Sequence, residues 1–219
     1  AMDPQQRKVL EHSFHCLSNV SERNFHASSS VFIGVSKNDF AELLRQHGAP
    51  ISAFVSTGTV HSIIANRVSY FFSLTGPCCA LDTACSSSTV ALTLAHRQIE
   101  ESRGALAGGV NALLSPTMFL SHAAAGMMSS KGRCATFDSS ADGYVRGEGV
   151  CLVYLSQSSD SVSDTAPTLL SSIFEHGGRA AGLTVPSGDS QCKVIGKALS
   201  AAGIFPEEVN SVEAHGTGT

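Results

Sequence analysis

The chain has 219 residues, of which 42% are hydrophobic and 15% charged, and its formal net charge at pH 7 is −4. This core-rich composition excludes an intrinsically disordered chain, and the lack of a Lys/Arg stripe or an aromatic-interleaved basic patch argues against nucleic acid as a partner. No apolar run approaches the roughly 20 residues that a membrane span needs, and the polar stretch Asp3–Arg7 does not resemble a signal peptide.

An amphipathic helix is predicted at the N-terminus. Asp3 can cap it, Pro4 suits its first turn, and Gln6 occupies the capping-box position. We expect the helix to end near Asn19. Its apolar face is predicted from three residues at helical spacing: Leu10, Phe14 and Leu17.

Strands and helices alternate along the rest of the chain. Apolar runs predict strands over residues 31–35, 78–81, 105–110, 150–155, 169–174 and 209–214. Helices are predicted over residues 40–46, 62–72 and 117–125, around the apolar stretch 89–95, and between a cap at Asp189 and a closing Gly203. This alternation predicts an α/β fold with a mainly parallel sheet covered on both faces. Two glycines in the strand 105–110 suggest a close backbone approach or a bend.

Cys85 lies at the turn between the strand that ends at Leu81 and the apolar helix that follows. Unpaired N–H groups and about half a positive charge gather at a helix N-terminus. This field favours a thiolate, the nucleophilic form of cysteine. The same N–H groups can hold the oxyanion that forms when the thiolate attacks a carbonyl. The pattern alone leaves a second role open, because an isolated cysteine in an apolar stretch is commonly a small core residue.

His215 follows the last predicted strand and precedes a Gly/Thr-rich stretch. A side chain at such a strand end can reach a pocket shared with other strand ends, so Cys85 and His215 form a plausible nucleophile–base pair. A surface role for this histidine stays equally open. In the long loop 127–149, Arg146 and Glu148 are expected to pair with each other rather than to act on a substrate.

The seven cysteines have no CxxC spacing, which argues against a disulfide framework and indicates a reducing compartment. A cytoplasmic location is expected because the sequence shows no targeting signal. His12 and Cys16 share a helical face, but no second ligand pair accompanies them, so no metal site is predicted.

Seven motifs, taken in order, resemble those of β-ketoacyl synthases, the condensing enzymes of polyketide and fatty acid synthesis. DTACSSS around Cys85 and VEAHGTGT around His215 resemble the active-site signatures of that family. The others are MDPQQR, ANRVSYFFSLTGP, LAGGVNALLSP, GRCATFDSSADGYVRGEG and GLTVPSG. The resemblance spans essentially the whole chain and is strongest to the ketosynthase domains of modular type I polyketide synthases.

The resemblance implies a thiolase-like fold, which is an α/β/α/β/α sandwich of two related halves, and a homodimer formed through the strand before Cys85. It makes Cys85 the nucleophile that accepts an acyl group from an acyl carrier protein. A malonyl-type thioester then loses CO2 and attacks this acyl thioester, and His215 stabilises the developing enolate. Thr217 and Thr219 match threonines that hydrogen-bond the phosphopantetheine arm. The substrates are thus carried on the carrier protein's phosphopantetheine, and no bound cofactor or metal is expected.

The same resemblance divides residues 1–219 into an N-terminal half, 1–155, and the start of a C-terminal half, 156–219. The family's first strand, its second histidine in an Asn-x-Gly-His motif, an upstream lysine and a glycine-rich oxyanion loop have no counterpart in the sequence. We therefore expect an internal fragment with little or no condensing activity of its own. Glu175–Gly178 departs from the Asn-Gln-Asp-Gly of many modular ketosynthases and is closer to Asn-His-Gly-Gly, which is found where acyltransferases are separate. His176 is expected to be structural.

Three other functions stay open on the sequence. A non-elongating ketosynthase would keep Cys85 and only accept or pass on acyl groups. A Cys/His hydrolase or amidase would cleave its substrate without releasing CO2. A non-catalytic dimerisation or docking module would need neither Cys85 nor His215.

Overall fold

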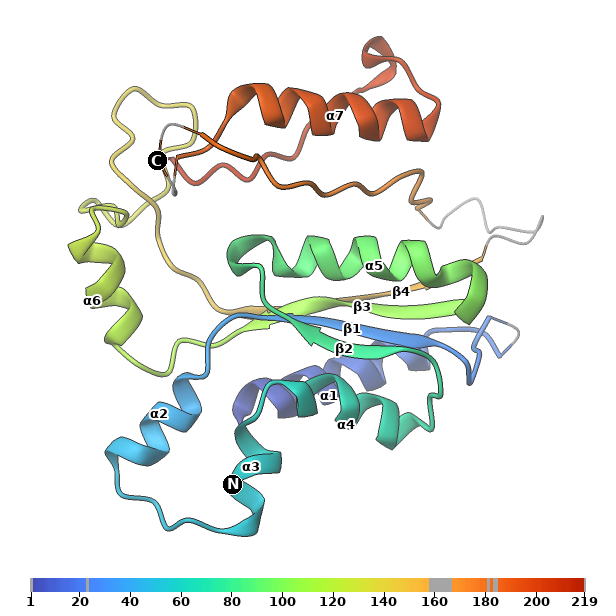
Figure 1. Cartoon of the computed structure of the whole chain (residues 1–219), viewed down its shortest axis with the longest axis vertical. Helices are drawn as coiled ribbons and strands as arrows, with labels where there is room; N and C mark the ends of the chain where they lie inside the picture. Colours follow the sequence, from blue (N-terminus) through green and yellow to red (C-terminus); the bar gives the residue numbers. More distant parts are fainter. Residues whose placement is uncertain (1, 23, 158–166, 181, 183–184, 219) are drawn as a thin grey trace.

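A four-stranded sheet forms the centre of the computed structural model, which describes residues 2–22, 24–157, 167–180, 182 and 185–218 (Figure 1). The strands lie in the order β2 (Cys78–Leu81), β1 (Ser30–Val35), β3 (Gly104–Asn111) and β4 (Gly149–Ser156). β1 pairs in parallel with β2 and β3, whereas β4 runs antiparallel to β3. The predicted mainly parallel sheet is confirmed.

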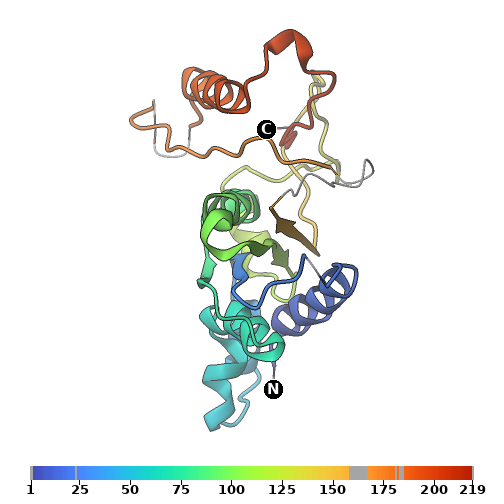
Figure 2. The same cartoon turned by 90° about the vertical axis from the view of Figure 1, so that its right-hand side faces the viewer.

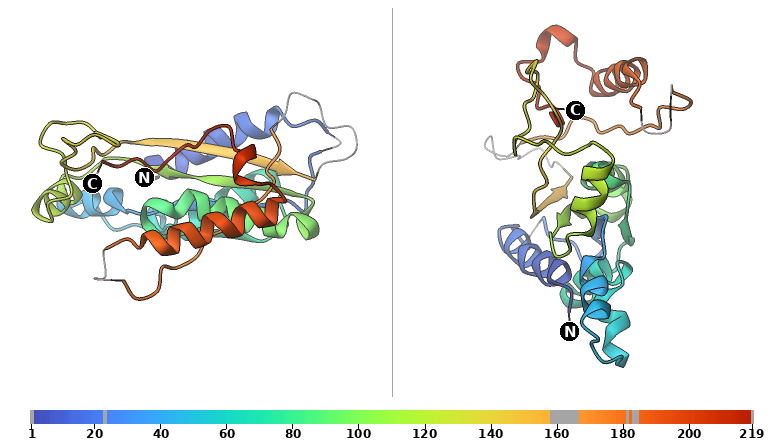
Figure 3. Two further views of the ribbon diagram at one scale, coloured as in Figure 1. Left: turned by 90° about the horizontal axis from the view of Figure 1, so that it is seen from above. Right: turned by 90° about the vertical axis from the view of Figure 1, so that its left-hand side faces the viewer.

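Helices cover both faces of this sheet. α1 (Pro4–Ser18) and α4 (Ser62–Phe72) lie on one face and α5 (Ser87–Ser102) on the other (Figures 1 and 2). α7 (Gly188–Ala202) forms a further layer beyond α5, as the side view in the right panel of Figure 3 also shows. None of the helices in the described part of the chain is long and apolar enough to cross a membrane.

Three shorter helices lie in the connections: α2 (Asp39–Gln46), α3 (Ala53–Thr59) and α6 (Thr117–Ala124). The described part of the chain also has two single turns of 3₁₀ helix, at Ala84–Ser86 and Pro206–Glu208. α3 was not predicted, because a seven-residue helix containing glycine and threonines shows no apolar period.

Among the described residues the core forms two clusters, one on each face of the sheet. The larger joins the sheet to α1 and α4 through side chains such as Val9, Ile33 and Val68, each with no exposed surface. The smaller joins the sheet to α5 and contains Phe32 and several alanines, among them Ala91. Alanines on α5 and β3 allow the helix to pack closely on the strands, so the start of α5 is held firmly against the sheet.

The N-terminal helix begins as predicted, because the Asp3 carboxylate accepts the Gln5 N–H at 2.7 Å. Two details were wrong. Gln6 does not close a capping box: the Asp3 N–H donates to the Gly58 carbonyl, and the Gln6 amide donates to the Val60 carbonyl at 3.3 Å. Phe14 is 56% exposed, because the buried face of the helix runs through Val9, Ser13 and Leu17 instead.

Three predictions in the C-terminal quarter were also wrong. Residues 169–174 and 209–214 are not strands, because neither segment forms backbone hydrogen bonds with another strand in the part of the chain that the structure describes. Residues 169–174 instead run over α5, where Ser172 contacts the Thr93 hydroxyl at 2.6 Å. The cap of α7 is Ser187, whose hydroxyl accepts the Ser190 N–H at 3.3 Å, whereas Asp189 lies inside the first turn.

Candidate active site

Cys85 lies on the short connection from β2 to α5, in the 3₁₀ turn that precedes the helix. The residue is exposed. The turn is unusual because Ala84 adopts a left-handed conformation, with φ at +55°. This places Cys85 at the N-terminal end of α5, as the sequence predicted, with its thiol accessible from solvent.

Side chains on both sides of Cys85 hold this turn. The Asp82 carboxylate accepts the Ala84 N–H at 2.8 Å. The Ser87 hydroxyl accepts the Thr83 N–H at 2.9 Å and donates to the Ala84 carbonyl at 2.6 Å. These contacts were not foreseen from the sequence, in which the serine run indicated only a helix start.

Glycines on the sheet bring the turn and the strands together. Gly34 on β1 and Gly109 on β3 are register partners. A Cβ on Gly34 would stand 2.5 Å from the Ser87 carbonyl carbon, and one on Gly109 would stand 2.8 Å from the Ser88 Cβ. The first turn of α5 therefore rests directly on these two glycines. The predicted close backbone approach in this strand is confirmed at Gly109.

Burial separates the cysteines into two groups. It raises the pKa of the Cys16, Cys78 and Cys79 thiols, which makes their thiolates scarce near neutral pH. The four exposed cysteines are Cys85, Cys134, Cys151 and Cys192.

The segment that contains His215 packs against the loop 134–143. The Thr136 hydroxyl donates to the Gly216 carbonyl, and the Gly143 N–H donates to the Gly218 carbonyl at 3.2 Å. His215 itself is exposed and Thr217 is half-buried, whereas Thr219 lies outside the described residues. These bonds fix the backbone on which His215 and Thr217 are carried.

The segments that carry Cys85 and His215 come from distant parts of the sequence but lie at one end of the molecule (Figure 1). The N-terminal end of α5, α6, the loop 127–149 and the C-terminal segment all gather there, beside the carboxyl ends of the parallel strands (Figure 1). Both side chains are exposed. Cys85 and His215 are thus both carried by segments at this end of the described structure.

Arg146 and Glu148 do not pair with each other as predicted. Arg146 lies over the Phe119 ring and donates to His122 Nδ1 at 3.3 Å, while Glu148 accepts the Leu113 N–H at 3.0 Å. The Tyr144 hydroxyl also contacts His122 Nδ1, at 2.5 Å. Burial, and then the nearby positive charge of Arg146, lower the pKa of His122. Arg146 and Glu148 thus connect the loop 127–149 to two different neighbours, His122 and the Leu113 backbone.

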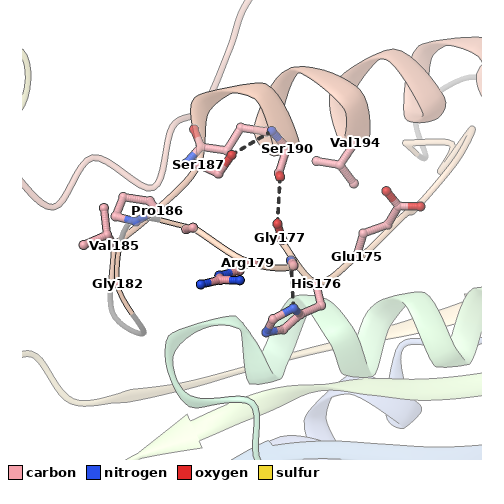
Figure 4. Close-up of a pocket in the computed structure, with 13 residues that line it drawn as sticks. Glu175, His176, Gly177, Arg179, Gly182, Val185, Pro186, Ser187, Ser190 and Val194 are labelled. Carbon is pink, nitrogen blue, oxygen red and sulfur yellow. Dashed lines mark hydrogen bonds between the residues drawn. The ribbon is translucent and has the colours of Figure 1, made fainter.

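A pocket of about 640 Å³ lies between residues 175–180, 182 and 185–187 and the first turns of α7, and neither Cys85 nor His215 lines it (Figure 4). His176 lines it and accepts the Gly178 N–H at its Nδ1, 2.9 Å away. The Ser190 hydroxyl donates to the Gly177 carbonyl at 3.1 Å, and Glu175 pairs with Lys197. These contacts stabilise a turn, which favours the structural role expected for His176.

Within the described ranges, no group of three or more His, Cys, Asp or Glu side chains is placed to hold a metal ion.

Family models match both parts of the chain. The model described as the N-terminal domain of beta-ketoacyl synthase matches residues 1–161, and the one described as the C-terminal domain matches residues 167–219.

Similar proteins are polyketide synthases. The chain is 42% identical to polyketide synthase ThaG of Burkholderia thailandensis and 42% identical to the non-reducing polyketide synthase mapC of Penicillium roqueforti. Both matches cover the whole chain, which spans only 4% and 9% of the length of these relatives.

Solved structures that are similar over the whole chain are ketosynthases. The ketosynthase from module 6 of the Bacillus subtilis bacillaene synthase has a TM-score of 0.83 at 33% identity, and the chain covers 39% of it. The oxazolomycin ketosynthase domain OzmH KS7 of Streptomyces albus has a TM-score of 0.81 at 37% identity, with 40% covered.

Proposed function

Because the chain belongs to the β-ketoacyl synthase family and has the fold of polyketide ketosynthases, we propose that it carries the acyl-accepting site of a condensing enzyme, with Cys85 as nucleophile. The observation that supports this most is the place of Cys85. Its exposed thiol stands at the N-terminal turn of α5, at the same end of the molecule as the His215 segment.

The first step is transfer of an acyl group to Cys85. The thiolate attacks the carbonyl carbon of an acyl thioester, a C–S bond forms, and the carbonyl oxygen becomes an oxyanion. When this intermediate collapses, the original C–S bond breaks and the departing pantetheine thiolate takes up a proton. Backbone N–H groups near the start of α5 are suited to stabilise the oxyanion.

The second step extends the acyl chain. A malonyl-type thioester loses CO2, and the resulting enolate carbon attacks the carbonyl of the acyl-Cys85 thioester. The Cys85 thiolate leaves, which yields a β-ketoacyl thioester that is two carbons longer. A hydrogen bond donated by His215 would stabilise the enolate oxygen, since charge develops there during decarboxylation. Thr217 and Thr219 would hold the pantetheine arm.

The partners belong to the same proposal. Because the chain spans only a small part of its relatives, the acyl carrier protein and the acyl and malonyl-type thioesters are proposed as partners of the whole enzyme. A homodimer would form through β2. This strand is one of the two edge strands of the described sheet, so its outer backbone groups can pair with a second copy. Residues 1–155 and 156–219 would belong to the two halves of the ketosynthase domain.

Mass spectrometry of the intact chain tests the proposal. After incubation with an acyl-pantetheine thioester, the wild type should gain the mass of one acyl group. Cys85→Ala should not, whereas Cys134→Ala, which removes another exposed thiol, should load like the wild type. Equal loading of Cys85→Ala would overturn the assignment. Release of a free carboxylic acid instead of a stable acyl group would point to a hydrolase.

A further inference from the structure

We propose that Ser87 is a positioning residue for Cys85, and that Asp82 assists it by fixing the peptide units around the nucleophile. The inference rests on the proposed function only in naming acyl transfer as the reaction that benefits. Neither side chain needs to touch the substrate, because both act on the backbone that precedes Cys85.

Ser87 is buried and links two backbone groups that precede Cys85. The residue is 5% exposed and lies where the first turn of α5 packs on Gly34. Its hydroxyl acts both as acceptor and as donor: it accepts a hydrogen bond from the Thr83 N–H and donates one to the Ala84 carbonyl. The two bonds close a ring of backbone that contains Cys85.

The bond to the Ala84 carbonyl has a direct consequence for Cys85. The Ala84 C=O and the Cys85 N–H belong to one planar trans peptide unit, so they point in opposite directions. Holding the carbonyl toward Ser87 therefore directs the Cys85 N–H away from Ser87. A fixed N–H beside the attacking sulfur is a suitable donor for the oxyanion that forms on acyl transfer.

Asp82 holds the other side of the same residue. Ala84 adopts a left-handed φ of +55°, which is unfavourable for an alanine and persists only when surrounding contacts enforce it. The Asp82 carboxylate accepts a hydrogen bond from the Ala84 N–H, while the Ser87 hydroxyl donates one to the Ala84 carbonyl. Both polar backbone groups of the strained residue are thus bound by side chains. Without them, the peptide that carries the Cys85 N–H is able to rotate.

Two reagents separate positioning from mere folding. p-Nitrophenyl acetate acylates a thiol through an oxyanion, whereas iodoacetamide alkylates it without one. Each reaction is measured at Cys85 by peptide mass spectrometry. We expect Ser87→Ala to slow acylation about tenfold or more while alkylation stays within about twofold, because only acylation depends on the oriented N–H.

Matched variants control the test. Ser88→Ala removes a hydroxyl that makes no hydrogen bond among the described residues, so both rates should match the wild type. Asp82→Ala should also slow acylation selectively, and Asp82→Asn should restore it because the amide oxygen can still accept the Ala84 N–H. Since Asp82 is exposed, this pair gives a result even where Ser87→Ala does not fold.

Acylation by p-nitrophenyl acetate that is unchanged in both Ser87→Ala and Asp82→Ala overturns the proposal, as does an equal loss of acylation and alkylation. Failure of the proposed function looks different. In that case the wild type accepts no acyl group from a pantetheine thioester, while the comparison of the two small reagents still shows whether Ser87 and Asp82 position Cys85.

Discussion

Replacing Gly34 with alanine tests how closely α5 is packed on the sheet. The new Cβ would lie 2.5 Å from the Ser87 carbonyl carbon and 2.7 Å from the Ser88 nitrogen. Both are backbone atoms, so no side chain can rotate away, and the start of α5 must move by about 0.9 Å to reach an ordinary contact of 3.4 Å. Overpacking of this kind costs about 1–3 kcal/mol of folding free energy.

Thermal unfolding followed by circular dichroism measures that cost. For a chain of this size, 1 kcal/mol corresponds to roughly 2–4 °C, so Gly34→Ala should lower the melting temperature by roughly 2–12 °C. Gly149→Ala is the matched control, because Gly149 is also a strand residue but has no atom within 4 Å of a built Cβ. Equal melting temperatures for the two variants would refute the close packing of α5 on β1.

Three further predictions concern stability. Leu106 has no exposed surface, so Leu106→Ala should cost about 2–5 kcal/mol in chemical denaturation, far more than Leu170→Ala at a position that is 56% exposed. Asp3→Ala should cost about 1 kcal/mol in the same assay, because it removes the cap on the Gln5 N–H; an unchanged midpoint would contradict this role. The folded protein holds the pKa of His122 below its ordinary value of 6.5. As the pH falls below 6.5, the unfolded chain therefore binds more protons at this histidine than the folded chain does, and folding loses stability. The melting temperature should therefore fall between pH 7 and pH 5, and His122→Gln should flatten that dependence; parallel curves would exclude His122 as the cause.

The central sheet could be predicted from the sequence because its strands are short apolar runs bounded by turns. β2 was predicted at Cys78–Leu81, where the structure has it, and the turn with Cys85 follows directly. The same pattern predicted a strand at residues 169–174, where the structure has none. An apolar run indicates that a segment is partly buried, but a strand also needs a hydrogen-bonded neighbour, and this segment has none among the described residues.

The parts of the site that could not be predicted depend on bonds between side chains and backbone. Nothing in the sequence distinguishes Ser87 from Ser86 or Ser88, because all three suit a helix start. Only the fold shows that Ser87 faces Gly34 and the Ala84 carbonyl. The expected pair of Arg146 and Glu148 failed for a similar reason, since neighbours distant in sequence bind each of them.

The most direct test of the proposed function is to map the acylated residue after the wild type has reacted with an acyl-pantetheine thioester. Digestion and peptide mass spectrometry would compare Cys85 with the other exposed cysteines, Cys134, Cys151 and Cys192, in one sample. We predict that the acyl group lies on Cys85 and that its loading is much faster than at the other three. Equal acylation of all four thiols would contradict a dedicated acyl-accepting site at the start of α5.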